Sequence, residues 1–304
     1  IYVKTWGDGD NAANPGVPLV LKPTRSVQDE DFVARNSVAD VYAQVIKDLT
    51  EAEAALPMTN GNYATKSAAA AMLSRVYLQQ GNYAAARDAA NRVIQSNAYR
   101  LAPSYDQLFY TFIGGGGATP AEYIFSMTVT AQDGANGLNT YYGVTVGSIP
   151  GTSGRGDFRI LPSHLALYEE DDARAAFFIR ANNNTYSQKH LDRFGHVPVV
   201  RLAEMYLTRA EANFRLGTAV GASPAADVNV IRQRAGLAPL QDVTLAQILK
   251  ERKLELAFEG VQLHDLKRTR SSVRGLAWNS PRLILPIPQR EMDTNKSLVQ
   301  NEGY

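Results

Sequence analysis

The sequence predicts a mainly α fold, in which helix pairs form a right-handed helical scaffold that carries a large loop-rich, partly β-like insertion. Two observations predict it: helical segments occur in pairs with small residues at regular spacing, and a long stretch between the pairs is rich in Gly, Asn, Ser and Tyr. With 304 residues, 45 % of them hydrophobic, the chain can bury a large core. We expect a single domain over residues 1–304.

The first helical part is expected over residues 37–100. Apolar residues in 37–56 recur at spacings of three and four, which indicates an amphipathic helix, and Pro57 lies just beyond it. Residues 65–100 indicate two helices broken at Gly81-Asn82, with small and large residues at the spacing of a tetratricopeptide helix pair. Small residues allow the two helices to approach closely.

The second helical part is expected over residues 199–304. A second pair is predicted at 201–236, with Gly217 and a small-residue loop as the break. Because two pairs are too few for a self-stabilising stack, we expect 245–268 to add a helix. Residues 101–198 form the loop-rich segment, with a β-like run, EYIFSMTVT, and function more often lies on such loops than on the scaffold.

Composition excludes several classes of function. The 31 basic and 30 acidic residues give a net charge of +1, so we expect no nucleic-acid partner. Without Cys there are no disulfides, thiolate nucleophiles or cysteine metal sites. The sequence has no apolar run of the roughly 18 to 20 residues that a membrane-spanning helix needs. It opens IYVKTWGDGD, without Met, so we expect that the N-terminus is processed or truncated.

Three glutamates raise the question of catalysis. Glu251, Glu255 and Glu259 recur at four-residue intervals in ILKERKLELAFEG, and carboxyls about 5 Å apart are what a retaining glycosidase needs. Unpaired like charges at this spacing destabilise a helix, however, and apolar residues crowd the same segment. We therefore favour structural ion pairs. The expected cationic partners are Arg201, Arg209, Arg232, Arg234 and Arg252.

Three long blocks resemble one family in order and spacing. The first block is ILKERKLELAFEGVQLHDLKR, the second is VVRLAEMYLTRAEANFRLG followed by DVNVIRQRAGL, and the third is the tail LILPIPQREMDTNKSLVQNEGY. They are similar to the conserved blocks of the SusD/RagB family, which are surface nutrient-binding lipoproteins of Bacteroidetes. The resemblance extends to the 65–97 helix pair and to DFRILPSHLALYEEDDARAAFF, and so covers most of the chain.

The resemblance implies a fold of tetratricopeptide helix pairs and a binding protein that is not an enzyme. Family members hold glycans at the cell surface and pass them to a SusC-like TonB-dependent outer-membrane transporter. They face outward from the outer membrane on a lipid anchor. We expect that this anchor, and a front part that usually contributes to the ligand site, are missing from this sequence. A few relatives bind peptides. No cofactor is implied.

Residue chemistry, rather than a family motif, selects the candidate ligand contacts. A glycan site needs aromatic faces for sugar rings and flanking polar groups for the hydroxyls. Loop positions that meet this demand are Trp6, Asn139, Tyr141, Tyr142, Trp278 and Asn279, with the polar pair Arg155 and Asp157 as a weaker candidate.

Other sites are not expected. The GGGG run at 114–117 lacks the Lys-Ser/Thr of a phosphate-binding loop, and the four histidines show no metal-ligand spacing. Asp8, Asp10 and Asn11 have the oxygen-rich spacing of a Ca²⁺ loop but lack its later Gly and Glu, so we assign no metal. Two alternatives to glycan binding remain. The first is a tetratricopeptide module that binds a peptide, and the second, ranked lower, is a glycoside hydrolase that uses Glu251, Glu255 and Glu259.

Overall fold

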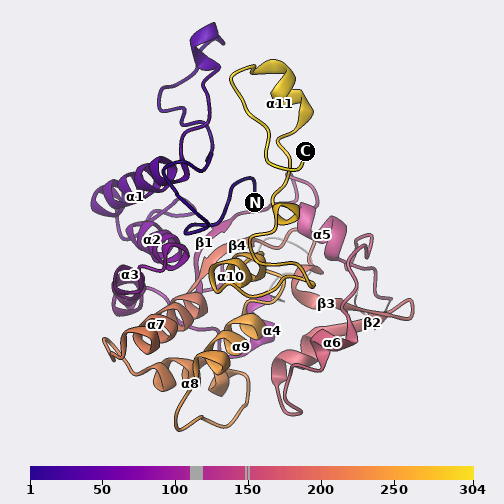
Figure 1. Cartoon of the computed structure of the whole chain (residues 1–304). Helices are drawn as coiled ribbons and strands as arrows, with labels where there is room; N and C mark the ends of the chain where they lie inside the picture. Colours follow the sequence, from indigo (N-terminus) through magenta and orange to yellow (C-terminus); the bar gives the residue numbers. More distant parts are fainter. Residues whose placement is uncertain (110–118, 148, 150) are drawn as a thin grey trace. The chain divides into compact units, whose positions relative to one another are not determined.

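The computed structural model describes residues 1–109, 119–147, 149 and 151–304 (Figure 1). The GGGG run at 114–117 lies outside the described residues. The chain divides into two compact units, which we describe separately: unit 1 comprises Ile1–Glu51, Gln79–Asn82 and Leu263–Tyr304, and unit 2 comprises Ala52–Leu78 and Tyr83–Gln262. The single domain expected over the whole chain stays a prediction.

The described part of the chain is mainly helical, which confirms the predicted fold class. The helices of the first predicted part are α1 (Val38–Ala55), α2 (Lys66–Gln80) and α3 (Tyr83–Gln95). Those of the second are α7 (Leu202–Leu216), α8 (Pro224–Arg234), α9 (Leu245–Glu255), α10 (Gln262–Arg268) and α11 (Gln289–Thr294).

Local signals explain where the predicted pairs break. Gly81 and Gly217 both adopt positive φ, and the N–H of Gly217 caps the end of α7 by donating to the carbonyls of Asn213 and Phe214. Ser223 then caps α8, because its hydroxyl accepts from the Ala226 N–H and Pro224 supplies the fixed φ of the first turn.

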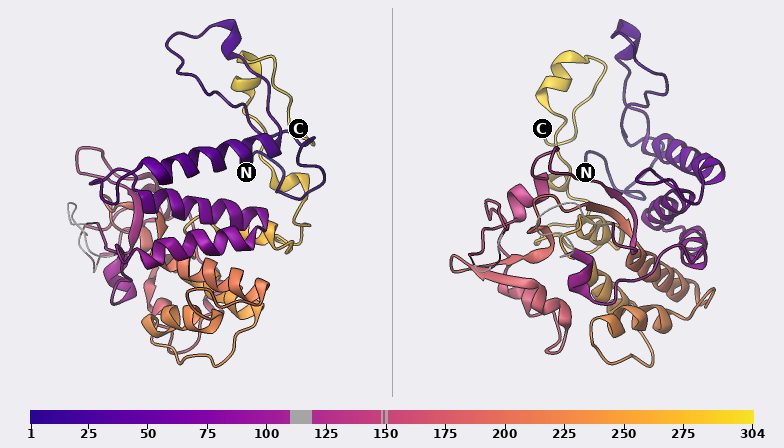
Figure 2. Two further views of the ribbon diagram at one scale, coloured as in Figure 1. Left: turned by 90° about the vertical axis from the view of Figure 1, so that its left-hand side faces the viewer. Right: turned by 180° about the vertical axis from the view of Figure 1, so that it is seen from behind.

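The core of unit 2 lies around α7, which packs against α3, α8 and α9. In Figure 2, α3 and α7 run side by side. One face of α7 meets small residues of α2 and α3, whereas the other meets α8 and α9 through Leu207, Ile231 and Ile248, which are fully buried. Small residues on α2 and α3, such as Ala70 and Ala90, line this contact and let α7 pack closely against it.

The helix expected over 245–268 is interrupted, which corrects the sequence prediction. α9 ends at Glu255, and α10 begins at Gln262. Between them Phe258 adopts φ 65° and Gly260 φ 80°, so the backbone turns through left-handed conformations that a helix cannot continue through. Glu259 therefore lies in a turn and not on the helix that carries Glu251.

The loop-rich segment is built from short elements. Its strands form two antiparallel pairs, β1 (Tyr123–Met127) with β4 (Val197–Arg201) and β2 (Phe178–Ala181) with β3 (Asn184–Ser187). The predicted run EYIFSMTVT thus includes β1. The short helices are α4 (Tyr105–Phe109), α5 (Gly137–Tyr142), α6 (Pro162–Leu165), η2 (Ala173–Phe177) and η3 (Gln188–His190).

Unit 1 brings together the two ends of the chain. Arg35 donates to the carbonyls of Tyr2, Gly16 and Val299 and to the side chain of Asn301, which is itself buried. The short helices η1 (Asp29–Asp31) and η4 (Pro281–Leu283) also belong to this unit. Among the described residues of the whole chain, no helix is both long enough and apolar enough to cross a membrane.

Candidate functional site

The glutamates of the signature segment lie in a buried cluster of charges, as the ion-pair interpretation predicts. Glu251 on α9 binds Arg174 at 2.5 Å, and Glu255 binds Arg201 at 2.5 Å and also contacts Arg234. Glu259 also belongs to this cluster, because it binds Arg201, and the cluster extends beyond these six residues. Its further members are Glu122, Asp172, Lys189 and Arg232.

The cluster uses some of the expected partners and not others. Arg201, Arg232 and Arg234 contribute as predicted. Arg209 instead pairs with Asp227 and Arg252 with Glu204, so two of the proposed partners were wrong. The loop-rich segment supplies Arg174, Lys189 and Glu122, which sequence reasoning missed because long-range pairing leaves no periodic signal in the chain.

Access, rather than electrostatics, argues against catalysis by this cluster. Burial disfavours the charged form of Glu255, yet Arg234, Arg201 and Arg174 outweigh it and hold its pKa well below the usual range. Burial raises the pKa of Glu251 against the opposing effect of Arg174. A general acid beside an ionised carboxylate would suit a glycosidase, but these two side chains are 5 % and 0 % exposed, so a sugar cannot reach them in this conformation.

A surface formed by α5 and residues 151–158 collects most of the predicted ligand contacts. We call it the platform. Tyr141 is 47 % exposed, with the Arg155 guanidinium 5.3 Å from the centre of its ring. Tyr142 stacks on Phe158 at a centroid distance of 4.4 Å, and Phe158 keeps 48 % of its surface exposed. Two aromatic side chains of the platform are thus available to solvent.

The polar groups of the platform are an exposed ion pair. Arg155 Nη2 lies 3.0 Å from the carboxylate of Asp157, and their side chains are 63 % and 34 % exposed. In this arrangement a guanidinium and a carboxylate flank the exposed Tyr141 ring. Such a combination can bind several hydroxyl groups of one sugar ring while the ring stacks on the aromatic face.

Backbone contacts hold the two halves of the platform together. The N–H groups of Arg155 and Asp157 donate to the carbonyls of Thr140 and Tyr141 on α5. Gly143 and Gly154 cross so closely that a Cβ on Gly154 would lie 2.3 Å from the backbone of Gly143. Only glycine fits at this crossing, which fixes the loop against the helix.

Asn139 is the exception among the platform candidates. Its side chain is 1 % exposed and donates through Nδ2 to the carbonyls of Ser153, His190 and Leu191, while its Oδ1 accepts from the Ser153 hydroxyl. Because these bonds occupy the amide, Asn139 holds the platform in place and does not reach a ligand in this conformation. Phe158, in contrast, was missed by sequence reasoning; its position directly after the GRGD turn was the available signal.

The remaining candidates lie in unit 1. Trp6 packs against Tyr42 at a ring distance of 4.8 Å, and Trp278 lies under the guanidinium of Arg270. Asn279 donates to Asp8 at 3.2 Å and lines a cavity of about 460 Å³. These residues belong to unit 1, whereas the platform belongs to unit 2.

Side-chain oxygens of the acidic loop near the N-terminus accept hydrogen bonds from the backbone of the same loop. Asn11 Oδ1 accepts from the Gly7 N–H, and Asp10 Oδ1 accepts from the Ala12 N–H. Within the described residues, no group of three or more His, Cys, Asp or Glu side chains has a geometry that could hold a metal ion.

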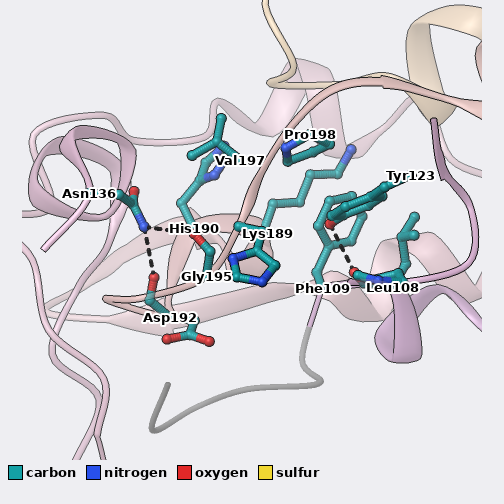
Figure 3. Close-up of a pocket in the computed structure, with 12 residues that line it drawn as sticks. Leu108, Phe109, Tyr123, Asn136, Lys189, His190, Asp192, Gly195, Val197 and Pro198 are labelled. Atoms are coloured by element: carbon teal, nitrogen blue, oxygen red, sulfur yellow. Dashed lines mark hydrogen bonds between the residues drawn. The ribbon is translucent and has the colours of Figure 1, made fainter. Parts of the chain in front are cut away.

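A small cavity lies next to the short helix η3 and to Asn136, the N-cap residue of α5 (Figure 3). Lys189, His190 and Asn136 help to line it. Its volume of about 30 Å³ corresponds to about one water molecule and cannot hold a sugar ring. Burial lowers the pKa of His190 to about 4, so its ring is neutral at pH 7.

Comparison with protein families identifies the chain. Residues 35–280 match the model of the SusD family. The chain belongs to the SusD family. The fold agrees with this assignment, because solved structures of the SusD superfamily share the tetratricopeptide-like helical architecture seen here.

Several relatives of this SusD-family chain are known. SusD-like protein P2 of Formosa agariphila is 26 % identical, over 95 % of this chain and 70 % of its own length. The starch-binding protein SusD of Bacteroides thetaiotaomicron is 35 % identical over 122 residues, which are 36 % of this chain and 21 % of that protein.

Solved structures resemble the chain over nearly its whole length. A putative sugar-binding protein of Bacteroides vulgatus matches with a TM-score of 0.81 and 27 % identity, over 97 % of this chain and 71 % of that one. A laminarin-binding SusD-like protein matches with a TM-score of 0.76 and 26 % identity, over 95 % of this chain and 74 % of its own.

Proposed function

We propose that this SusD-family chain binds a glycan on the platform without cleaving it. The observation that carries the proposal is the exposed pair of aromatic side chains, Tyr141 and Phe158, flanked by the Arg155–Asp157 ion pair. Sugar rings stack their apolar faces on aromatic rings and satisfy their hydroxyls with charged side chains, so this surface has both parts of a glycan site. Tyr142 supports Phe158 from below, and Asn139 holds the loop.

The named relatives support glycan as the class of ligand. One is named for starch, one for laminarin and one as a putative sugar-binding protein. These names describe those proteins, and the particular sugar and linkage bound by this chain depend on its own loops. A shallow, solvated platform of this kind predicts modest affinity, because ordering the ligand offsets much of the contact energy.

The proposal also covers delivery of the glycan. We infer that the bound sugar passes to a SusC-like TonB-dependent transporter, and that the protein faces outward from the outer membrane on a lipid anchor. Membership of the SusD family supports these inferences. A pull-down of the anchored protein from native outer membranes tests them; recovery without a TonB-dependent transporter would contradict the delivery step.

Calorimetric titration with laminarin and starch oligosaccharides tests the binding proposal, with a parallel assay for reducing ends. We expect saturable binding without sugar release, and binding that Tyr141→Ala or Phe158→Ala weakens about tenfold. Tyr63→Ala is the matched control, since Tyr63 is an aromatic residue 77 % exposed elsewhere in unit 2. Binding of peptides and not sugars would favour the peptide-binding alternative, and release of reducing ends would revive the hydrolase.

Tryptophan fluorescence separates the two predicted regions. Both tryptophans of the chain, Trp6 and Trp278, lie in unit 1, whereas the platform contains none. Heat of binding without a fluorescence change would therefore favour the platform. A fluorescence change abolished by Trp278→Phe, together with an effect of Asn279→Ala, would show that the unit 1 region contacts the ligand.

A further inference from the structure

The short helix η3 contributes Lys189 to the buried charge cluster and contacts the platform through His190. Its two adjacent side chains, Lys189 and His190, leave the backbone in different directions (Figure 3). Both are buried, at 9 % and 8 % exposure. Burying two successive ionisable side chains costs free energy unless each has hydrogen-bond partners, so those partners indicate the role of the helix.

Lys189 connects η3 to the turn that follows α9. Its ammonium donates to the carbonyls of Glu255 and Ala257, at 3.1 and 2.8 Å, and to the carboxylate of Glu259 at 2.5 Å. The three donors of the ammonium are therefore all used. The same group lies about 5 Å from the ring centres of Tyr105 and Phe109, so the ammonium is held on every side.

His190 connects η3 to the platform. Its ring meets Tyr142 edge-on at 5.2 Å, and its backbone carbonyl accepts from the amide of Asn139 at 2.9 Å. Ring Nε2–H also donates to the carbonyl of Phe258, in the same turn that Lys189 binds. Contacts among Asn139, Tyr142 and His190 thus join the α5 helix of the platform to the turn that contains Phe258.

The turn itself is under conformational constraint. Phe258 adopts φ 65°, a left-handed conformation that a bulky side chain enters only where its surroundings impose it. This conformation presents the Phe258 carbonyl to His190 and returns Glu259 to Lys189 and Arg201. Loss of the Lys189 bonds would therefore release the turn and η3 together.

We propose that Lys189 and His190 are positioning residues for glycan binding, which set the geometry of the platform by fixing α5 to the buried charge cluster. The proposal rests on the proposed function for its effect on affinity, but its structural part does not depend on any ligand. Neither residue touches the exposed face of the platform, so their influence acts through Tyr142 and Asn139.

Lys189→Met is the test, with Arg209→Met as the matched control. Arg209 is also a buried cation in unit 2, and its hydrogen-bond partners, Asp227 and Asn91, belong to α8 and α3. We expect Lys189→Met to lower glycan affinity about tenfold at a temperature where it remains folded, and Arg209→Met to lower stability with affinity retained. Equal affinities of both variants and the wild type would overturn the proposal.

A ligand-free readout separates this proposal from the proposed function. Hydrogen exchange at the amides of Arg155 and Asp157, which bond to α5, should speed up in Lys189→Met and not in Arg209→Met. Faster exchange in a protein whose wild type binds no glycan would leave the positioning role standing and contradict the proposed function. Unchanged exchange would overturn the positioning role. If Lys189→Met does not fold, His190→Leu, which removes the ring contact and the bond to Phe258, takes its place.

The pH dependence of glycan affinity is a further test, because a purely structural role of Lys189 would not alter it. Burial lowers the pKa of Lys189 to about 8, against the opposing effect of Glu259. Affinity should therefore fall as pH rises from 7 to 9 in the wild type and stay flat in Lys189→Met. The other titratable and charged groups around Lys189 keep their charge states over this range: Tyr105 and Tyr123 have raised pKa values, Glu255 and Glu259 lowered ones, and Arg201 and Arg234 raised ones. A wild-type profile flat from pH 7 to 9 would overturn the assignment.

Discussion

The buried charge cluster and the platform use the same kinds of side chain for opposite purposes. In the cluster, Arg201 and Glu255 are 1 % and 0 % exposed, and they bind each other and further charged residues of the cluster. In the platform, Arg155 and Asp157 form a similar pair at 63 % and 34 % exposure. Desolvated charges must be paired to be tolerated, so the cluster specifies the fold, whereas exposed charges can exchange partners with a ligand.

The comparison predicts that substitutions in the cluster change stability and substitutions in the platform change affinity. Glu255→Gln should have the largest effect, because it removes a buried carboxylate that Arg174, Arg201 and Arg234 share. Removing one partner of a buried pair costs about 3–5 kcal/mol. Urea denaturation at pH 7 measures this loss. A loss below about 1 kcal/mol would show that the cluster does not hold the fold.

Acid should destabilise the protein through His190. Its pKa is about 4 in the fold, below the ordinary 6.5, so between these values the unfolded chain binds more protons than the folded one. The free energy of unfolding should therefore be highest above pH 6.5 and fall as pH drops toward 4. A shift of this size corresponds to about 3 kcal/mol. The measurement is denaturation at several pH values, and His190→Leu should flatten the profile; an equally steep profile in that variant would contradict the assignment.

Gly154→Ala should break the platform. Its φ of 130° and the close approach to Gly143 leave no room for a methyl group, so we expect a loss of about 1–3 kcal/mol in stability together with loss of glycan binding. Gly134→Ala is the control, because Gly134 also has positive φ but no atom within 4 Å of the added Cβ. Loss of binding in both variants would show that backbone strain, and not the crossing, is responsible.

Asp157→Asn should have the smallest effect on stability. An exposed ion pair contributes about 0–1 kcal/mol, so the unfolding curve should hardly move. Affinity for the glycan should nevertheless fall, because the carboxylate is one of the two charged groups beside Tyr141. Calorimetry and thermal denaturation of the same sample measure the two effects. A large loss of stability with unchanged affinity would reverse the contrast with the cluster.

The sequence was most informative where the signal is local. The helices α1, α2, α3, α7 and α8 follow from periodic apolar residues and from breaks at glycine, because both depend on neighbours within a few positions. It was least informative about pairing. Nothing local indicates that Arg174, Lys189 and Glu122 complete the cluster, since they lie 77, 70 and 79 residues from Glu251, Glu259 and Arg201, with which they pair.

The structure brings together part of the residues that were predicted to contact a ligand. Tyr141, Tyr142, Arg155 and Asp157 meet on one surface, although only their residue types suggested it. In the structure Asn139 is buried, and Phe158, which was not predicted, is exposed on the platform. Exposure in an irregular loop depends on long-range contacts that the sequence does not display.

By itself, the sequence determined the fold class, the helix pairs and the signature blocks of the SusD family, because these depend on local spacing and composition. Only the tertiary structure decided that Glu259 lies outside the helix, that the glutamates are buried among arginines, and that the platform contacts η3. The physical reason is burial: whether a charge or a ring faces solvent is settled by the residues packed over it, which come from distant parts of the chain.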